Sequence, residues 1–272
     1  MSEQIRVIFI AAHPDDCEIH AGGMAAMYAA AGHVVKFVSL TNGGTGHFQM
    51  GGGELARRRY AEAQAAADII GITYDIVDNH TGELEPNVAN RKTVVRMIRD
   101  FRPDIVLLLS PDDYHPDHRY ASVLVQDSAY LVTVPGMCPL TPHLMQNPVY
   151  AYANGSVTTS TTFDPTLVFD IDGAIEKKLD MACCHESQYL EWIPYNQGCL
   201  DQVPEDKAEA REWMRERFSA RWHRFADRWR DRLVARYGEE RGAAVQYAEA
   251  IEICPFGSQP DQDELNHLFP FE

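Results

Sequence analysis

The chain has 272 residues, of which 45% are hydrophobic, and its formal net charge is -16 at pH 7. This length and apolar content are enough for one large domain, or for a domain with an extension. The negative charge argues against nucleic acid or an anionic membrane surface as a partner, because both select basic faces. No apolar run approaches the ~20 residues that cross a bilayer, and no secretory signal pattern is present. We therefore expect a soluble, cytoplasmic protein without membrane insertion.

The first 110 residues alternate between short apolar strands and segments with helical periodicity. Strands are expected at 5–12, 33–41, 72–78 and 104–110, and helices at 18–31, 54–70 and 91–101. The last of these strands, "DIVLLLS", is apolar throughout, which is typical of a parallel strand covered on both faces. This order predicts an α/β fold, with a Rossmann-like, doubly wound and mostly parallel sheet that carries helices on both faces.

Beyond residue 148 the pattern is looser. Strands are expected at 149–153 and 167–172, a helix at 174–184, and a long charged helix from Glu205 to Tyr237. The long helix has an apolar stripe with spacings of three or four, formed by Phe218, Trp222, Phe225, Trp229, Leu233 and Tyr237. Such a stripe packs on its own domain or contacts another subunit. We expect a catalytic domain over 1–190, a C-terminal helical extension over 191–272 packed on it, and a homo-oligomer.

Two polar motifs follow strands of the expected sheet. "HPDD" comes after the first strand, at 13–16, and "YHPDH" comes after the fourth, at 114–118. In doubly wound sheets the functional loops lie at the carboxyl ends of strands, and both motifs occupy such positions. The two motifs are therefore expected to lie side by side.

The residue types in these motifs are those of a metal site. His13 and Asp16 are three residues apart, so at the start of a helix they share one side while Asp15 points elsewhere. A catalytic zinc takes three protein ligands and keeps an open position for water. The third ligand would then be His115 or His118. The alternative interpretation of "HPDD" is a turn with a helix cap, for which Asp and Pro are also suited.

The motifs resemble those of the PIG-L/LmbE family of zinc-dependent de-N-acetylases. The resemblance covers about residues 5–190, and "AHPDDCEIHAGG" and "HPDH" are its specific part. It also includes "TNGG", Arg59 and Glu62 in "RYAEA", and "FDID…KKLDMACCHESQ" at 169–188. Relatives often carry an acidic residue after "TNG", whereas the loop at 43–53 is neutral and glycine-rich, so substrate contacts there cannot be transferred.

The resemblance implies a role for each residue of the two motifs. His13, Asp16 and His118 would be the zinc ligands, Asp15 the general base, and a protonated His115 the group that meets the oxyanion. Zn²⁺ is the implied cofactor, although the same donors also suit Fe(II) or Co(II).

Three further residues are candidates for roles around this centre. Asp117 is expected to orient His115 and hold it charged, or else to cap the helix that begins nearby. Arg59 and His185 are candidates for contact with the substrate.

The resemblance therefore implies a zinc-dependent hydrolase that removes an N-acetyl group from a small amino sugar of the N-acetylglucosamine type, or from its conjugate. A metal-dependent phosphoesterase is an alternative, because Asp/His loops on α/β sheets also build two-metal sites. A non-catalytic sugar-binding relative is another, against which the retained Asp15 argues.

Overall fold

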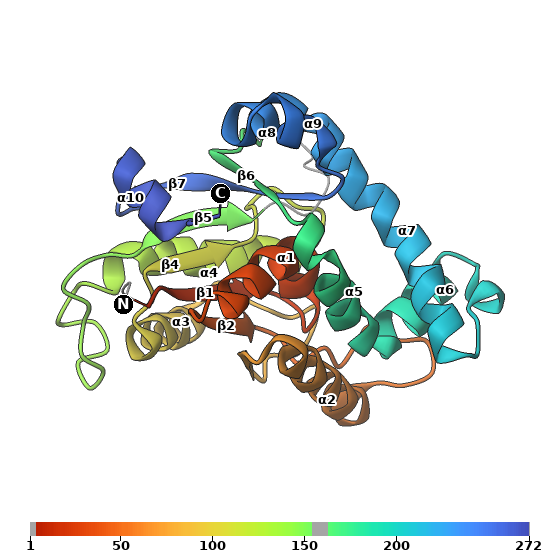
Figure 1. Ribbon diagram of the computed structural model, residues 1–272. Coiled ribbons are helices and arrows are strands. Elements are labelled where there is room, and N and C mark those ends of the chain that lie inside the picture. Colours follow the sequence, from red (N-terminus) through yellow and green to blue (C-terminus); the bar gives the residue numbers. More distant parts are fainter. Residues whose placement is uncertain (1–3, 154–162, 272) are drawn as a thin grey trace.

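The computed structural model describes residues 4–153 and 163–271, and its described strands form one sheet (Figure 1). The order is β3-β2-β1-β4-β5-β7-β6. The strands are β1 (Arg6–Ala11), β2 (Val34–Ser39), β3 (Thr73–Ile76), β4 (Ile105–Leu108), β5 (Val149–Ala153), β6 (Leu167–Asp170) and β7 (Ala248–Gly257). The first five are parallel, and β7 runs antiparallel to both β5 and β6. The predicted α/β fold with a mostly parallel sheet is confirmed.

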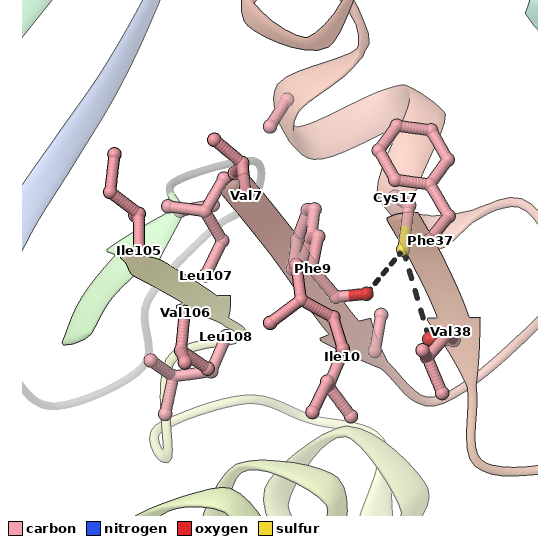
Figure 2. Close-up of a cluster of buried hydrophobic side chains, with 14 of the residues drawn as sticks. Val7, Phe9, Ile10, Cys17, Phe37, Val38, Ile105, Val106, Leu107 and Leu108 are labelled. Carbon is pink, nitrogen blue, oxygen red and sulfur yellow. Dashed lines mark hydrogen bonds between the residues drawn. The ribbon is translucent and has the colours of Figure 1, made fainter. Parts of the chain in front are cut away.

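Helices cover both faces of the sheet (Figure 1). They include α1 (Asp16–Ala30), α2 (Gly52–Ile70), α3 (Val88–Phe101), α4 (Pro116–Leu131) and α5 (Ile175–Cys184). Helices α1, α2 and α5 contact one another, while α3 packs against α4. Between these layers β1 is buried almost completely, with Phe9 between Phe37 of β2 and Leu107 of β4 (Figure 2). The continuous apolar strands follow from this cover on both faces.

The C-terminal region differs from the expected helical extension. It contains α6 (Ile193–Asn196), α7 (Lys207–Arg228), α8 (Arg230–Tyr237), α9 (Glu239–Ala244) and α10 (Gln262–Leu268), but it also supplies β7. This strand lies between β5 and β6, so the region after residue 190 completes the sheet. The sequence analysis expected no strand after residue 172 and therefore did not identify β7. In the structure its first four residues are buried.

The long helix expected from Glu205 to Tyr237 is two helices. The break falls at Trp229, whose φ of -115° and ψ of 29° are not helical, and no Gly or Pro marks it in the sequence. The apolar stripe packs inside the chain: Trp222 and Leu233 are buried, and Leu233 lies in one cluster with Val168 of β6. The alternative in which the stripe contacts another subunit is therefore not supported. None of the helices in the described parts of the chain has the length and apolar character of a membrane span.

A buried ion pair joins α1 to β7 and α5. The Glu249 carboxylate of β7 accepts hydrogen bonds from the backbone N–H groups of Gly23 (2.8 Å) and Met24 (2.7 Å), and Lys178 Nζ lies 2.5 Å from its Oε1. A Cβ atom at Gly23 would come within 2.9 Å of Ile171, so only glycine allows this close approach. These contacts hold α1 in place, and the first turn of α1 contains Asp16 of the predicted metal site.

Candidate active site

The two predicted motifs meet at the carboxyl ends of the neighbouring strands β1 and β4. His13 follows β1 and Asp16 opens α1, while His118 lies in the first turn of α4. His115 caps α4, because its Nδ1 accepts a hydrogen bond of 3.1 Å from the backbone N–H of Asp117. The expected juxtaposition of the motifs is therefore present.

Three side chains form a compact group of donor atoms. Nδ1 of His13 lies 3.1 Å from Nε2 of His118, and carboxylate oxygens of Asp16 lie 3.5 Å from the first and 3.4 Å from the second. Ligands about 2.0–2.1 Å from a tetrahedral ion are separated from one another by about 3.3–3.4 Å. The two histidine nitrogens are separated by nearly this distance, and each lies near this distance from a different oxygen of Asp16, Oδ2 for His13 and Oδ1 for His118.

His115 belongs to a wider group that could also hold a metal. Donor atoms of His13, His115 and His118 all lie within 4.8 Å of one another. The rings of His13 and His115 meet edge to face, with centroids 4.6 Å apart. The three histidines are therefore close enough to hold a metal ion together, and Asp16 lies beside two of them.

Each of the two close histidines has a second carboxylate on its other ring nitrogen. Asp117 Oδ2 lies 3.1 Å from Nε2 of His13, and Asp113 Oδ1 lies 3.1 Å from Nδ1 of His118. Carboxylates in this position fix the tautomer and the orientation of a ligating imidazole. The expected partnership of Asp117 with His115 is thus corrected: the Asp117 side chain orients His13, and only its backbone contacts the His115 ring. Sequence analysis missed Asp113, which lies in the same loop.

Without a metal, protons stabilise the crowded donors. Burial alone would lower the pKa of His13, but hydrogen bonds with Asp117 and Asp16 outweigh it and raise that pKa to about 9. For Asp16, burial would raise the pKa, but the neighbouring His118 and His13 hold it well below its usual range. The metal-free group is thus a cluster of a protonated His13 and an ionised Asp16, and a metal bound there would have to displace the proton of His13.

Asp15 stands apart from the donor atoms and is held by Arg59. Nη2 of Arg59 lies 3.0 Å from Oδ1 of Asp15 and donates a second hydrogen bond, of 3.1 Å, to the carbonyl of Pro14. Arg59 is 3% exposed, and a Cβ atom at Gly43 would lie 2.6 Å from its Cδ. Gly43 also has a φ of +75°, so glycine is required there for two reasons. The Arg59 expected to bind substrate therefore acts first on Asp15.

The donors and Asp15 open into a cavity of about 500 Å³. Its walls include residues that sequence analysis did not select, namely Tyr114, Trp192, Trp213, Arg217, Arg221 and Arg224. The aromatic and basic residues come mainly from the region after 190, which only tertiary packing brings to the motifs. The sole signal in the sequence was the spacing of the three arginines along one helix.

His185 does not line this cavity. It is fully buried, and its Nε2 lies 2.9 Å from Oε1 of the equally buried Glu18. The expectation that His185 contacts substrate is therefore wrong, because no surface of the ring is accessible. Its contact with Glu18 links the end of α5 to α1 in the interior of the protein.

Comparison with known proteins identifies the family. A model of the PIG-L family, described as GlcNAc-PI de-N-acetylase, matches residues 8–129. A diacetylchitobiose deacetylase of Thermococcus kodakarensis is 33% identical over 207 residues, which span 70% of this chain and 74% of that protein. The chain belongs to the PIG-L family.

Two further comparisons concern the fold and the range of activities among similar proteins. The structure of an N,N'-diacetylchitobiose deacetylase from Pyrococcus horikoshii aligns with a TM-score of 0.71 at 24% identity, covering 92% of this chain and 84% of that one. A 4-oxalmesaconate hydratase of Pseudomonas putida is 27% identical over 210 residues, 73% of this chain and 80% of that protein. The predicted family and fold are confirmed, and so is the expectation of an enzyme.

Proposed function

We propose that the protein is a zinc-dependent hydrolase that removes the acetyl group from a small N-acetylated amino sugar, of the N-acetylglucosamine type, or from its conjugate. The observation that carries the proposal is the triangle of donors formed by His13, Asp16 and His118, with Asp15 beside it at the base of one cavity. The deacetylase among the relatives supports amide hydrolysis as the reaction.

The donor residues would hold a metal, and the residues beside them would handle the proton of the attacking water. When bound, zinc would polarise the amide carbonyl and lower the pKa of water. Asp15 takes the proton of the attacking water and passes it to the leaving nitrogen, as a general base and then a general acid. Arg59 holds Oδ1 of Asp15, and Oδ2 has no hydrogen-bond partner within 4–153 and 163–271. One carboxylate oxygen is therefore anchored while the other handles the proton.

His115 is suited to donate a hydrogen bond to the oxyanion as a neutral ring. Because Nδ1 accepts from the backbone N–H of Asp117, the proton of the neutral imidazole lies on Nε2. Burial lowers the pKa of His115, and the charges of His13 and His118 lower it further. We therefore replace the protonated His115 of the sequence interpretation with a neutral N–H donor, which needs no extra positive charge beside the metal.

Release of free amine from N-acetylglucosamine derivatives tests the proposed reaction. The purified protein is assayed with and without a chelator, and zinc is then added back. Activity that is lost with the chelator and restored by zinc is expected. Amine release that survives complete metal removal would contradict the proposal, and hydrolysis of p-nitrophenyl phosphate in its place would favour a phosphoesterase.

Hydration is a second candidate, favoured by the relative named 4-oxalmesaconate hydratase, which the alignment covers over 80% of its length. A metal centre with a carboxylate base can also add water to a double bond. Consumption of 4-oxalmesaconate, followed by chromatography, in the absence of amine release from acetylated sugars would select this activity.

The cytoplasmic location and the homo-oligomer remain proposals. The apolar stripe that suggested a subunit contact packs against the chain's own clusters, with Trp222 and Leu233 buried, so it no longer supports assembly. Light scattering of the purified protein decides the matter: a mass near 30.7 kDa at micromolar concentration would exclude the oligomer.

A further inference from the structure

Helix α7 places three arginines along one wall of the active-site cavity. Arg217, Arg221 and Arg224 are spaced by four and three residues, so they lie on one face of the helix. The chain as a whole carries a net charge of -16, which makes this local concentration of positive charge unusual for the molecule. The cavity wall also contains two acidic residues, Asp15 and Asp16. Asp15 is paired with Arg59, and Asp16 lies beside the histidines.

The same helix shows what its arginines do when they serve the fold. Arg211 and Arg215 both bind Glu176 of α5, at 2.8 Å and 2.5 Å. By contrast, Arg221 and Arg224 have no hydrogen bond, ion pair or ring contact within the described residues. Their side chains are thus available to a ligand.

Arg217 is held in place by contacts, whereas Arg221 is only partly buried. The guanidinium of Arg217 lies over the Trp213 ring, 4.5 Å from its centroid, and donates to Oε1 of Gln197. Arg221 is half-buried, and burial lowers its pKa. A guanidinium that has lost part of its hydration without gaining an acceptor is unfavourable, and an anionic ligand would offset that cost.

We propose that the face formed by Arg217, Arg221 and Arg224, called here the arginine face, binds a phosphate or carboxylate of the substrate. The inference rests on the proposed function, since the acyl group of the same molecule would lie at the histidine cluster. The favoured substrate is then an anionic N-acylated amino sugar rather than a neutral one. Arg221, half-buried among Tyr114 and Tyr189 in the cavity wall, makes the central contact.

Calorimetric titration tests the arginine face without turnover. The zinc-loaded Asp15→Asn protein is titrated with N-acetylglucosamine, N-acetylglucosamine 6-phosphate and N-acetylmuramic acid. We expect one of the two anions to bind at least about tenfold more tightly than the neutral sugar, as for a charge-assisted hydrogen bond. The phosphate and the carboxylate are separate arms, so the result also identifies the anionic group.

Matched variants assign the effect to the arginine face. Adding Arg221→Gln is expected to remove the preference for the anion and leave binding of the neutral sugar unchanged, whereas Arg221→Lys retains part of it. Arg228→Gln is the control, because Arg228 lies on the same helix, is exposed and does not line the cavity. Thermal melting confirms that each variant is folded. Equal affinities for the three sugars, or a preference that survives both Arg221→Gln and Arg224→Gln, would overturn the inference.

Failure of the inference is distinguishable from failure of the proposed function. The wild-type protein could deacetylate N-acetylglucosamine while neither anion binds more tightly and the arginine variants have no effect. That result would support the proposed function and reject the inference about the arginine face. Alternatively, an anion could bind in a way that depends on the arginines while no amine is released from any of these sugars. That result would support the arginine face and reject the proposed deacetylase activity.

Discussion

Asp15 and Asp16 are adjacent carboxylates with different surroundings. The Asp16 carboxylate accepts hydrogen bonds from the backbone N–H groups of Ala12 and His13 and lies between two histidines, while Asp15 is held by Arg59. Under the proposed function these different surroundings give identical side chains different work: Asp16 would hold the metal, and Asp15 would move a proton.

Replacement of each carboxylate by its amide separates the two roles. Asp15→Asn is expected to retain zinc while kcat falls by roughly 10²–10⁴, because only the base is lost. Asp16→Asn is expected to lose most of its zinc and to regain activity in part when the metal is added in excess. Elemental analysis and initial rates on the same samples measure both effects. Full metal content in Asp16→Asn, combined with loss of metal in Asp15→Asn, would reverse the assignment.

The gain in stability from zinc should increase with pH. The pKa of His13 is raised from 6.5 to about 9 in the metal-free protein, so protonated His13 stabilises that form fully below pH 6.5. This contribution disappears as the pH rises towards 9. The metal requires the deprotonated ring, so its affinity increases over the same interval. The difference in Tm between the zinc-loaded and metal-free protein should therefore be larger at pH 9 than at pH 6.5.

His13→Gln is the matched variant for this pH effect. Its melting temperature should depend less on pH than that of the wild-type metal-free protein, because the titrating ring is absent. A difference in Tm that is the same at both pH values would show that His13 does not exchange its proton for the metal.

The local motifs made most of the site predictable, and the residues that were missed lie elsewhere in the fold. His13 and Asp16 follow from spacing within the first motif, whereas the choice of His118 over His115 and the role of Asp15 follow from the family resemblance. Asp113 escaped notice because "SPDDY" has the composition of an ordinary turn.

Residues that reach the site through tertiary packing were beyond the sequence alone. Whether Asp117 orients His13 or His115 depends on how α4 packs beside β1, which spacing does not specify. Arg221 lies more than a hundred residues beyond the second motif, and only the packing of α7 brings it to the cavity.

Helix α1 depends on a group supplied by the far end of the chain. Its helical geometry is interrupted at Ala21, whose φ is -144°, and Glu249 accepts the N–H groups of the two residues that follow Gly22. Lys178 balances the charge of Glu249. The interruption and its buried acceptor therefore form one unit.

Glu249→Ala is expected to destabilise the protein by about 3–5 kcal/mol, since it leaves Lys178 buried without its partner. Urea unfolding measures the change. The double variant Lys178→Met/Glu249→Leu should recover part of the loss, because it removes both charges. A double variant no more stable than Glu249→Ala would show that the helix N–H groups, rather than the ion pair, dominate.

For the molecule as a whole, the placement of β7 joins the sequence-matched catalytic region to the C-terminal region. A chain ending at residue 204 retains every motif residue but lacks β7 and α7. It should unfold without a cooperative transition, because among the described strands β6 loses its only neighbour and β5 loses one of its two. Circular dichroism during heating tests this. A cooperative transition with bound zinc would establish 1–190 as an independent domain.

The position of β7 also sets an order of events during synthesis. The parallel strands β1 to β5 can assemble as soon as they leave the ribosome, because each pairs with a strand already made or soon to follow. β6 must wait, since β7, the one strand that pairs with it in the described parts of the chain, emerges about eighty residues later. Until then the buried faces of β5 and β6 are exposed to other nascent chains. Helix α7 with the arginine face is synthesised in the same interval. The cavity therefore acquires its arginine residues at about the time when β7 completes the sheet.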